Sequence, residues 1–306
     1  MGRHKKPKRQ FTPQMTVAQF EALFPTDDAC KAYLAERRWP AGNVHCPKCN
    51  SERVYPIKTM PFKWECPACA PKGYRFSVLV GTIFENTNVP LRTWFKVIYQ
   101  MLTSKKGVSA LQIQRQMGFG SYSTALYLCH RVRGGLVDPN FRKLMGIVEV
   151  DETYVGGSDY NRHADKKSGK PGLGDPSKTI VMGAVRRKGK VVARVVENTK
   201  KETVESFVRE AVSTRVSLLC SDDNRSYGRL KYRFPHEVVD HSIGQHVVGA
   251  VHTQTIDGFW SLIKRGVVGT YHKVSRKYLP LYVAEFEFRY NNRDNPDIFG
   301  SAIGRC

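Results

Sequence analysis

Four of the eight cysteines fall into two close pairs, Cys46-Pro-Lys-Cys49 and Cys66-Pro-Ala-Cys69. Two cysteines separated by two residues sit on a tight turn, so two such pairs can present four thiolates to one tetrahedral ion. A site closed by four thiolates has no open position for water, and we expect a structural Zn²⁺ there rather than a catalytic one. Two disulfides are the alternative, but nothing else in the sequence suggests secretion.

Carboxylates follow two apolar runs in the second half of the chain. Asp151 comes directly after the predicted strand Ile147–Val150, and Asp222 and Asp223 follow the predicted strand Val216–Cys220 after one serine. A charge at the end of an apolar strand is costly unless a cation compensates it. Because hard divalent cations prefer carboxylate oxygens, Asp151 and Asp222 are candidate metal ligands.

A third acid, Asp257, lies in a segment whose apolar spacing predicts a helix from about residue 253. Lys264 follows seven residues later, two turns on and therefore on the same helical face. Acids from two strands and a helix could converge on divalent cations at a phosphate, the two-metal arrangement for in-line displacement at phosphorus. Each aspartate alone could equally be an ordinary strand-end or helix residue.

The charge balance favours the interpretation that these acids do chemistry on a polyanion. The 306 residues include 49 Lys+Arg against 27 Asp+Glu, a formal net charge of +22. Such an excess attracts nucleic acid first and an anionic lipid surface second. No apolar run approaches the ~20 residues that span a bilayer, and the first ten residues lack the apolar stretch of a signal peptide. We therefore expect a soluble, cytoplasmic protein with no membrane partner.

Two short predicted helices, 108–117 and 121–133, flank the turn Gly118-Phe119-Gly120 and match the plan of a helix-turn-helix. On the second helix, Tyr122 and Arg131 fall on the side away from the apolar stripe, where a DNA groove would lie. A helical linker that packs two domains together is the alternative.

The segment beyond residue 146 is rich in β-forming residues and predicts a mixed α/β sheet. The expected strands are 147–150, 179–185, 191–196, 216–220 and 237–239, with helices near 202–213, from about 253 and from about 275. Residues 156–178, rich in Gly, Lys and Pro, predict a mobile basic insertion between the first two strands. Its candidate phosphate contacts are Arg162, Lys166, Lys167 and Lys170.

An ordered series of motifs carries a resemblance to a known family. The series is Arg38-Trp39-Pro40 ahead of Cys46, Val148-Glu-Val-Asp-Glu-Thr-Tyr154, Gly156-Gly157, Ser221-Asp222, Phe259-Trp260, Lys264-Arg265, Gly269-Thr-Tyr-His272 and Glu285-Phe-x-Phe-Arg-Tyr-Asn-Asn-Arg293. On these residues the sequence resembles the IS1595-type, or ISXO2-like, DDE transposases over most of its length.

The resemblance implies an α/β fold: an RNase H-like catalytic domain, a mixed sheet flanked by helices, preceded by a zinc ribbon and a helix-turn-helix-like module. The implied limits are 1–40 for a basic tail and N-terminal helices, 41–88 for the zinc ribbon, 89–140 for the helical module and 145–295 for the catalytic domain. Asp151, Asp222 and Asp257 would form an acidic triad that holds Mg²⁺ or Mn²⁺. The family usually has Glu at the position of Asp257. Lys264 and Arg265 would contact DNA.

The implied function is that of a DNA transposase. Such an enzyme binds the ends of a mobile element, cleaves DNA strands and joins the freed 3′-hydroxyl to target DNA by two-metal phosphoryl transfer. Its partners would be double-stranded DNA and further copies of itself, in the bacterial nucleoid. Two alternatives remain: a catalytically inactive, transposase-derived DNA-binding protein, and a zinc-ribbon nuclease that acts on structured RNA.

Overall fold

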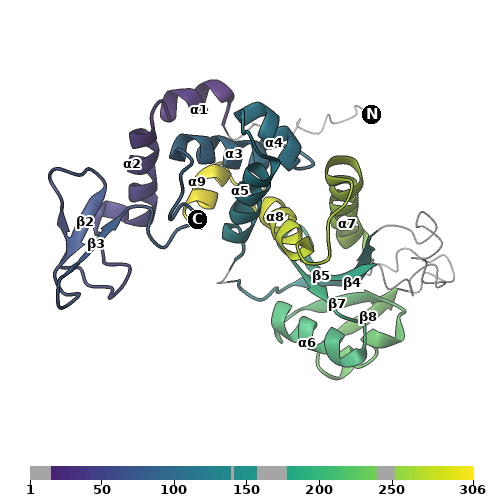
Figure 1. Cartoon of the computed structure of the whole chain (residues 1–306). Helices are drawn as coiled ribbons and strands as arrows, with labels where there is room; N and C mark the ends of the chain where they lie inside the picture. The colour runs from purple at the N-terminus through teal and green to yellow at the C-terminus, as the bar shows by residue number, and fades with distance from the viewer. Residues whose placement is uncertain (1–14, 139–140, 157–177, 240–251) are drawn as a thin grey trace, which may run out of the picture. The chain divides into compact units, whose positions relative to one another are not determined.

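The computed structural model describes residues 15–138, 141–156, 178–239 and 252–306. They form two compact units: residues up to 105 with residues 295–306, and residues 106–294 (Figure 1). The four basic residues predicted to contact phosphate, Arg162, Lys166, Lys167 and Lys170, lie outside the described residues. No helix in the described parts of the chain is both long and apolar enough to cross a bilayer.

The described part of the first unit contains four α-helices and a small sheet. The helices are α1 (Val17–Leu23), α2 (Asp27–Arg38), α3 (Leu91–Thr103) and α9 (Ile298–Ile303), and a 3₁₀ turn, η1 (Pro40–Gly42), follows α2. Their core is aromatic, with ring centroids 5.1 Å apart between Phe24 and Phe95 and 5.5 Å apart between Phe95 and Phe299. Asp27 caps α3, because its carboxylate accepts hydrogen bonds from the backbone N–H of Leu91 at 3.1 Å and Arg92 at 2.9 Å.

The small sheet of the first unit is antiparallel and carries part of the cysteine cluster. Its strands are β1 (Tyr55–Pro56), β2 (Lys63–Cys66) and β3 (Tyr74–Ser77), in that order. Trp64 of β2 packs between Trp39, at 4.9 Å, and Phe76, at 5.9 Å between ring centroids. So small a sheet buries little apolar surface, so a bound metal would add substantially to its stability.

The second unit is built on a five-stranded mixed sheet. Its strands are β4 (Ile147–Val155), β5 (Thr179–Arg186), β6 (Val191–Val196), β7 (Leu218–Asp222) and β8 (His236–Val239), in the order β6-β5-β4-β7-β8. β5 and β6 run antiparallel to β4, whereas β7 and β8 run parallel to it. The chain reaches β7 through α6 (Lys201–Ala211). This is the mixed α/β sheet of the predicted RNase H-like fold, and that prediction is confirmed.

Helices cover both faces of this sheet. Val148 and Val150 of β4 pack with α6 in one core, and Val181 and Val185 of β5 pack in a second core with α7 (Gln254–Gly266) and α8 (Leu279–Asn291). Figure 1 shows α6 on the opposite side of the sheet from α7 and α8. Because side chains alternate along a strand, neighbouring residues of β4 face different helices. This alternation determines which face of the sheet each acidic side chain of β4 points to.

α8 also covers the open edge of β6. The Asn291 side chain accepts a hydrogen bond from Val191 N at 2.7 Å and donates one to Val191 O at 2.9 Å. The Glu287 carboxylate accepts from Ala193 N at 3.1 Å and from Arg194 Nη1 at 3.0 Å. An uncovered edge would offer these backbone groups to another chain, so α8 takes the place of a sixth strand.

The predicted helix-turn-helix pair forms α4 (Ala110–Met117) and α5 (Tyr122–Gly135). Gly118 ends α4 in the left-handed region, at φ +69°. Both helices belong to the second unit, whereas α3 belongs to the first. α5 is joined to α8 by the Arg133–Glu285 ion pair, 2.7 Å long and fully buried on both sides. The predicted helical module at 89–140 therefore contributes to both units.

Two strands differ from their predicted limits by two residues or more, and β5 and β8 each differ by one. The structure continues β4 four residues beyond Asp151, so this acid lies within a strand and not at its end. β5 pairs with β4 as far as Val155↔Thr179, and Thr, Tyr and Val are good strand formers. β7 begins and ends two residues later than predicted, which makes Asp222 its last residue.

Gly183 of β5 allows α7 to lie close to the sheet. A Cβ at this position would lie 2.5 Å from the Trp260 ring and 3.0 Å from Ile256 Cδ1. We predict that Gly183→Ala lowers the free energy of unfolding by about 1–3 kcal/mol, as overpacking does in other cores. Gly258→Ala is the control, because a Cβ there meets no atom within 4 Å. Equal urea midpoints for both variants would contradict the close approach.

Candidate active site

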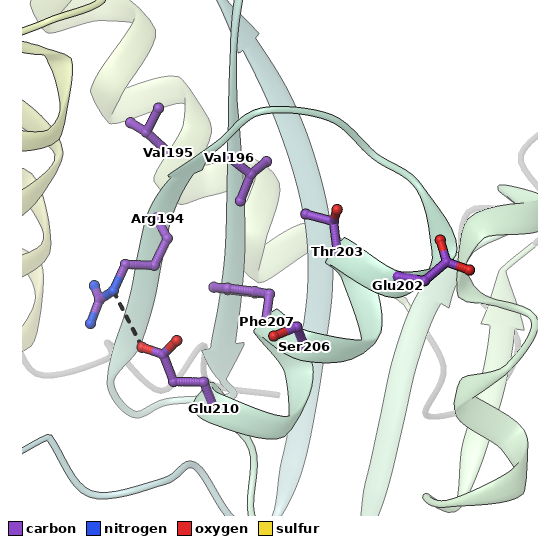
Figure 2. A pocket seen from close by; sticks show the side chains of 8 residues that line it. All are labelled: Arg194, Val195, Val196, Glu202, Thr203, Ser206, Phe207 and Glu210. Carbon is purple, nitrogen blue, oxygen red and sulfur yellow. Dashed lines mark ion pairs between the residues drawn. The ribbon is translucent and has the colours of Figure 1, made fainter.

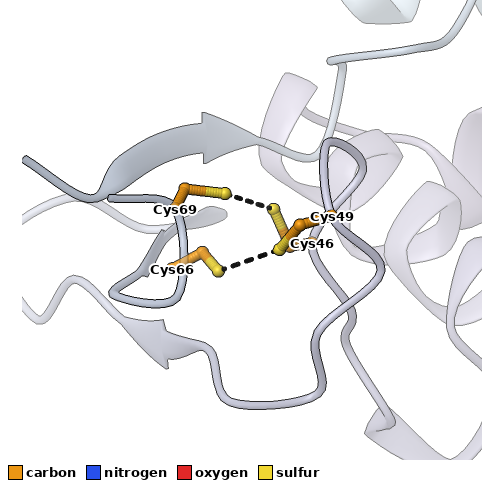
Figure 3. Close-up of side chains that lie close together, drawn as sticks. All are labelled: Cys46, Cys49, Cys66 and Cys69. Atoms are coloured by element: carbon orange, nitrogen blue, oxygen red, sulfur yellow. Dashed lines mark hydrogen bonds between the residues drawn. The ribbon is translucent and has the colours of Figure 1, made fainter. Parts of the chain in front are cut away.

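The four cysteine sulfurs of the first unit form one compact group (Figure 3). Cys46 Sγ lies 3.7 Å from Cys69 Sγ, and Cys49 Sγ lies 3.6 Å from Cys66 Sγ. A disulfide would bring two sulfurs to about 2.05 Å. Four thiolates about 2.3 Å from one zinc ion stand about 3.8 Å apart at the corners of a tetrahedron. The prediction that these cysteines form one group is confirmed, and their spacing and chemistry fit Zn²⁺.

Asp151 and Asp222 lie on adjacent parallel strands. The last register pair of β4 and β7 is Glu149↔Cys220, and each aspartate lies two residues beyond its member of that pair. Adjacent strands are about 4.8 Å apart, so the two residues lie side by side at the same position along the strands. Beyond Glu149, the only described strand that pairs with β4 is β5. The acids therefore project where the pairing between β4 and β7 has ended.

The Asp151 carboxyl is largely buried on the α7 face of β4. Burial is the main cause that raises its pKa, to about 7, and the charges of Glu152 and Asp222 act in the same direction. The indole N–H of Trp260 donates a hydrogen bond to Asp151 Oδ2 at 2.8 Å and opposes this shift. Negative charge at this place is costly without a compensating cation. The arrangement is therefore one that a cation would stabilise.

Glu152 lies on the other face of β4, and no sequence argument singled it out. Its carboxylate accepts hydrogen bonds from the buried Tyr227 hydroxyl and from Asn224 Nδ2, the latter at 3.1 Å. Burial raises the pKa of Glu152, and the charge of Asp222 adds to the shift. Asn224 N also donates to Asp222 Oδ1 at 3.2 Å. Asn224, in the turn after β7, thus links the Glu152 and Asp222 carboxylates. Glu152 is therefore a further acid close to Asp151 and Asp222.

The structure places Asp257 in the first turn of α7 and Lys264 and Arg265 in its last turn, all three exposed. Ile256 and Trp260, which flank Asp257 on this helix, pack over Gly183 of β5. Asp151, Asp222 and Asp257 do not bring three oxygens within 4.8 Å of one another; among the described residues only the cysteine group meets that criterion. Carboxylates repel one another, which keeps their oxygens apart unless a cation lies between them.

Asp223 differs from its neighbour. It is exposed, whereas Asp222 is half-buried beside Asp151 and Glu152. Asp223 follows the last residue of β7, so the strand places Asp222 at the site and does not place Asp223 there.

The exposed side of α5 carries aromatic and basic groups. Tyr122 is 49% and Tyr127 55% exposed, and Arg131 Nη1 donates to the Tyr127 hydroxyl at 2.8 Å. The opposite side of the helix is buried, as its apolar spacing predicts, at Ala125, Leu128, Cys129 and Val132. Tyr122 and Arg131 therefore lie where a nucleic acid could contact them.

A shallow hollow of about 520 Å³ lies elsewhere, over β6 and α6 (Figure 2). Arg194 and Glu210 line it and face one another at 3.7 Å. None of the acids of β4, β7 or α7 lines this hollow. It therefore offers no constellation for chemistry on a phosphate.

Two parts of the chain are similar to domains of known protein families. Residues 143–291 match the ISXO2-like transposase domain, and residues 25–72 match the transposase zinc-ribbon domain. The chain therefore contains an ISXO2-like transposase domain and a transposase zinc-ribbon domain. The first match spans β4 to α8 and includes all three predicted acids, and the second includes the four cysteines. The resemblance predicted from the sequence is therefore confirmed.

One curated relative of this chain is an uncharacterized protein in the transposable element ISH50 of Halobacterium salinarum. It is 28% identical over 269 residues, which cover 84% of this chain and 88% of the relative. A solved structure of a simian T-cell lymphotropic virus intasome in complex with PP2A regulatory subunit B56 gamma also matches. It is 14% identical with a TM-score of 0.29, covering 64% of this chain and 65% of that chain. At this TM-score the likeness carries no argument about fold or function.

We predict one Zn²⁺ per chain by elemental analysis of the purified protein. Cys66→Ser should abolish stoichiometric zinc, because three thiolates no longer close the tetrahedron. Cys129→Ala should retain it, since Cys129 is buried in α5 and lies outside the cysteine group. Full zinc content in Cys66→Ser, or disulfides among these cysteines, would contradict this assignment.

We predict that without added divalent cation the free energy of unfolding falls as pH rises from about 4 to about 7. The unfolded chain releases the Asp151 proton near its ordinary pKa of 3.8, whereas the folded chain retains it up to about 7. The unfolded state then binds fewer protons across this range, and stability decreases with pH. Urea unfolding at several pH values measures this. Asp151→Asn should flatten the slope, and an unchanged slope would contradict the shift.

Proposed function

We propose that this protein is a DNA transposase that binds the ends of a mobile element, cleaves DNA strands and joins the freed 3′-hydroxyl to target DNA. The observation that supports this most is that the charges of Asp151, Glu152 and Asp222, on two adjacent parallel strands of the ISXO2-like transposase domain, act on one another. Repelling carboxylates in a half-buried site favour a divalent cation as their partner.

The donor set fits Mg²⁺ or Mn²⁺, which Asp151, Asp222 and Asp257 would hold through carboxylate oxygens. Such a cation, when bound, supplies the positive charge that stabilises the attacking and leaving oxygens at phosphorus. Trp260 orients the Asp151 carboxylate, and Asn224 orients that of Asp222. Asp257 is one methylene shorter than the Glu usual in the family, so α7 must carry it closer to β4.

The end of α7, the helix α5 and the zinc ribbon would bind the DNA. Lys264 and Arg265 lie exposed in the last turn of α7 and can contact phosphates next to the acids. Tyr122 and Arg131 on α5 would lie against the element ends, together with the zinc ribbon. Two ends must be held together during transposition, so we further propose that identical chains assemble on the DNA, in bacteria at the nucleoid.

We predict that Asp151→Asn and Asp222→Asn each lose metal-dependent cleavage of labelled DNA carrying the element ends, by orders of magnitude. DNA binding should persist or strengthen, because negative charge near phosphate is reduced. Asp223→Asn is the matched control and should cleave like the parent, since its side chain is exposed. Gel analysis of cleaved and joined products with Mg²⁺ or Mn²⁺ measures each variant.

The third acid has its own pair of variants. Asp257→Ala should lose cleavage, whereas Asp257→Glu should retain or raise it because the carboxylate is kept and lengthened. If Asp257→Ala cleaves like the parent, the assignment is wrong at this residue. A parent protein that binds the ends but cleaves nothing would be a transposase-derived DNA-binding protein, and one that cuts only structured RNA would be a nuclease of another class.

A further inference from the structure

Glu149 is a fully buried acid that the proposed chemistry does not use. It lies on β4 two residues before Asp151 and therefore on the same face of the strand. Its exposed fraction is 0%. A buried carboxylate is costly unless its oxygens accept hydrogen bonds or pair with a cation. Its partners therefore show what this residue is for.

One partner of Glu149 is a guanidinium, and the others belong to the start of α7. Arg187 Nε donates to Glu149 Oε1 at 2.7 Å. Thr255 donates through its backbone N–H, at 2.8 Å to Oε2, and through its hydroxyl, at 2.9 Å to Oε1. Ile256 N donates to Oε2 at 3.1 Å. His252 Nδ1 lies 3.2 Å from Oε1. The carboxylate thus joins β4, and the residue that follows β5, to the beginning of α7.

These contacts make Glu149 the N-terminal cap of α7. The residue at the cap position, Thr253, makes no side-chain capping hydrogen bond. Thr255 and Ile256 are the second and third residues of the helix, where N–H groups lack an acceptor within the helix. Glu149 supplies that acceptor and also places a negative charge at the positive end of the helix dipole. The cap comes from a strand 106 residues earlier in the chain.

A second contact fastens α7 to β4 one turn later. Trp260 donates from its indole N–H to Asp151 at 2.8 Å. Asp257 lies between this contact and the capped residues Thr255 and Ile256 on the helix. Two contacts along one helix fix both its position and its rotation relative to the strand. The separation of Asp257 from Asp151 therefore depends on the cap.

We propose that Glu149 is a positioning residue: it holds the first turn of α7 against β4 and thereby sets where Asp257 stands relative to Asp151. Arg187 assists, because its guanidinium also donates to His252 O at 2.9 Å, just before the helix. The capping part rests on the contacts alone, and the catalytic part rests on the proposed function. Loss of supporting hydrogen bonds around metal ligands costs roughly 10–100-fold in metal affinity or activity elsewhere.

The test compares Glu149→Gln with Glu287→Gln in the full-length protein. Glu287 is a matched control, since it is also buried and accepts from an arginine and a backbone N–H, but on α8 at the edge of β6. Hydrogen exchange should show faster exchange of the Thr255 and Ile256 amides in Glu149→Gln and no change there in Glu287→Gln. Thr255→Val, which removes only the hydroxyl donor, is the mild variant should Glu149→Gln fold poorly. It should shift exchange in the same direction by less.

The catalytic readout is the dependence of DNA cleavage on Mg²⁺ concentration. Glu149→Gln should need roughly 10–100-fold more Mg²⁺ for half-maximal cleavage or lose a similar factor in rate. DNA binding should stay unchanged. Glu287→Gln should follow the parent curve, which separates positioning from a general loss of stability.

Each outcome decides between the two claims. Unchanged exchange at Thr255 and Ile256 in Glu149→Gln overturns the cap. An active parent whose Glu149→Gln variant keeps the same rate and the same Mg²⁺ dependence overturns the positioning role. Faster exchange in a protein whose parent cleaves no DNA supports the cap and refutes the proposed function instead.

Discussion

The constraint on which this structure depends is the cost of placing carboxylates on the central strand of an apolar sheet. β4 carries Glu149, Asp151 and Glu152 among valines that are fully buried. Each acid has different hydrogen-bond donors that offset this cost. Glu149 accepts from a guanidinium and a helix N-terminus, Asp151 from an indole, and Glu152 from a hydroxyl and a side-chain amide. The pKa values of Asp151 and Glu152 are raised, mainly by burial and also by the charges of neighbouring acids. A divalent cation would neutralise the negative charge of these acids.

The same contacts organise the second unit. α7 lies against β4 and β5 because Gly183 leaves room for the Trp260 ring. α8 closes the edge of β6 through Glu287 and Asn291, and it also carries the Glu285 partner of Arg133 on α5. The helix proposed to meet DNA is therefore packed on the same framework that supports the acids. A buried ion pair broken on one side is strongly destabilising, so α5 is not an independent appendage of this unit.

Much of this could be predicted from local sequence pattern. The two Cys-x-x-Cys pairs predict one four-sulfur group, and the β-branched run 191–196 predicts β6 with its correct limits. Period-two alternation could also have placed Glu149 and Asp151 on one face. The end of β4 was missed, because pairing with β5 extends the strand past its charged residues. The roles of Tyr227 and Trp260 depend on contacts across 75 and 109 residues, which no local pattern contains.

In the proposed function, the carboxylates at the end of β7 and in the middle of β4 hold divalent cations for phosphoryl transfer. Anomalous diffraction from the full-length protein crystallised with Mn²⁺ and duplex DNA of the element ends tests it most directly. We predict Mn²⁺ density between the Asp151 and Asp222 carboxylates, within ligand distance of Asp257 and of a DNA phosphate. Manganese bound only elsewhere on the protein, with these carboxylates remaining apart, would contradict it.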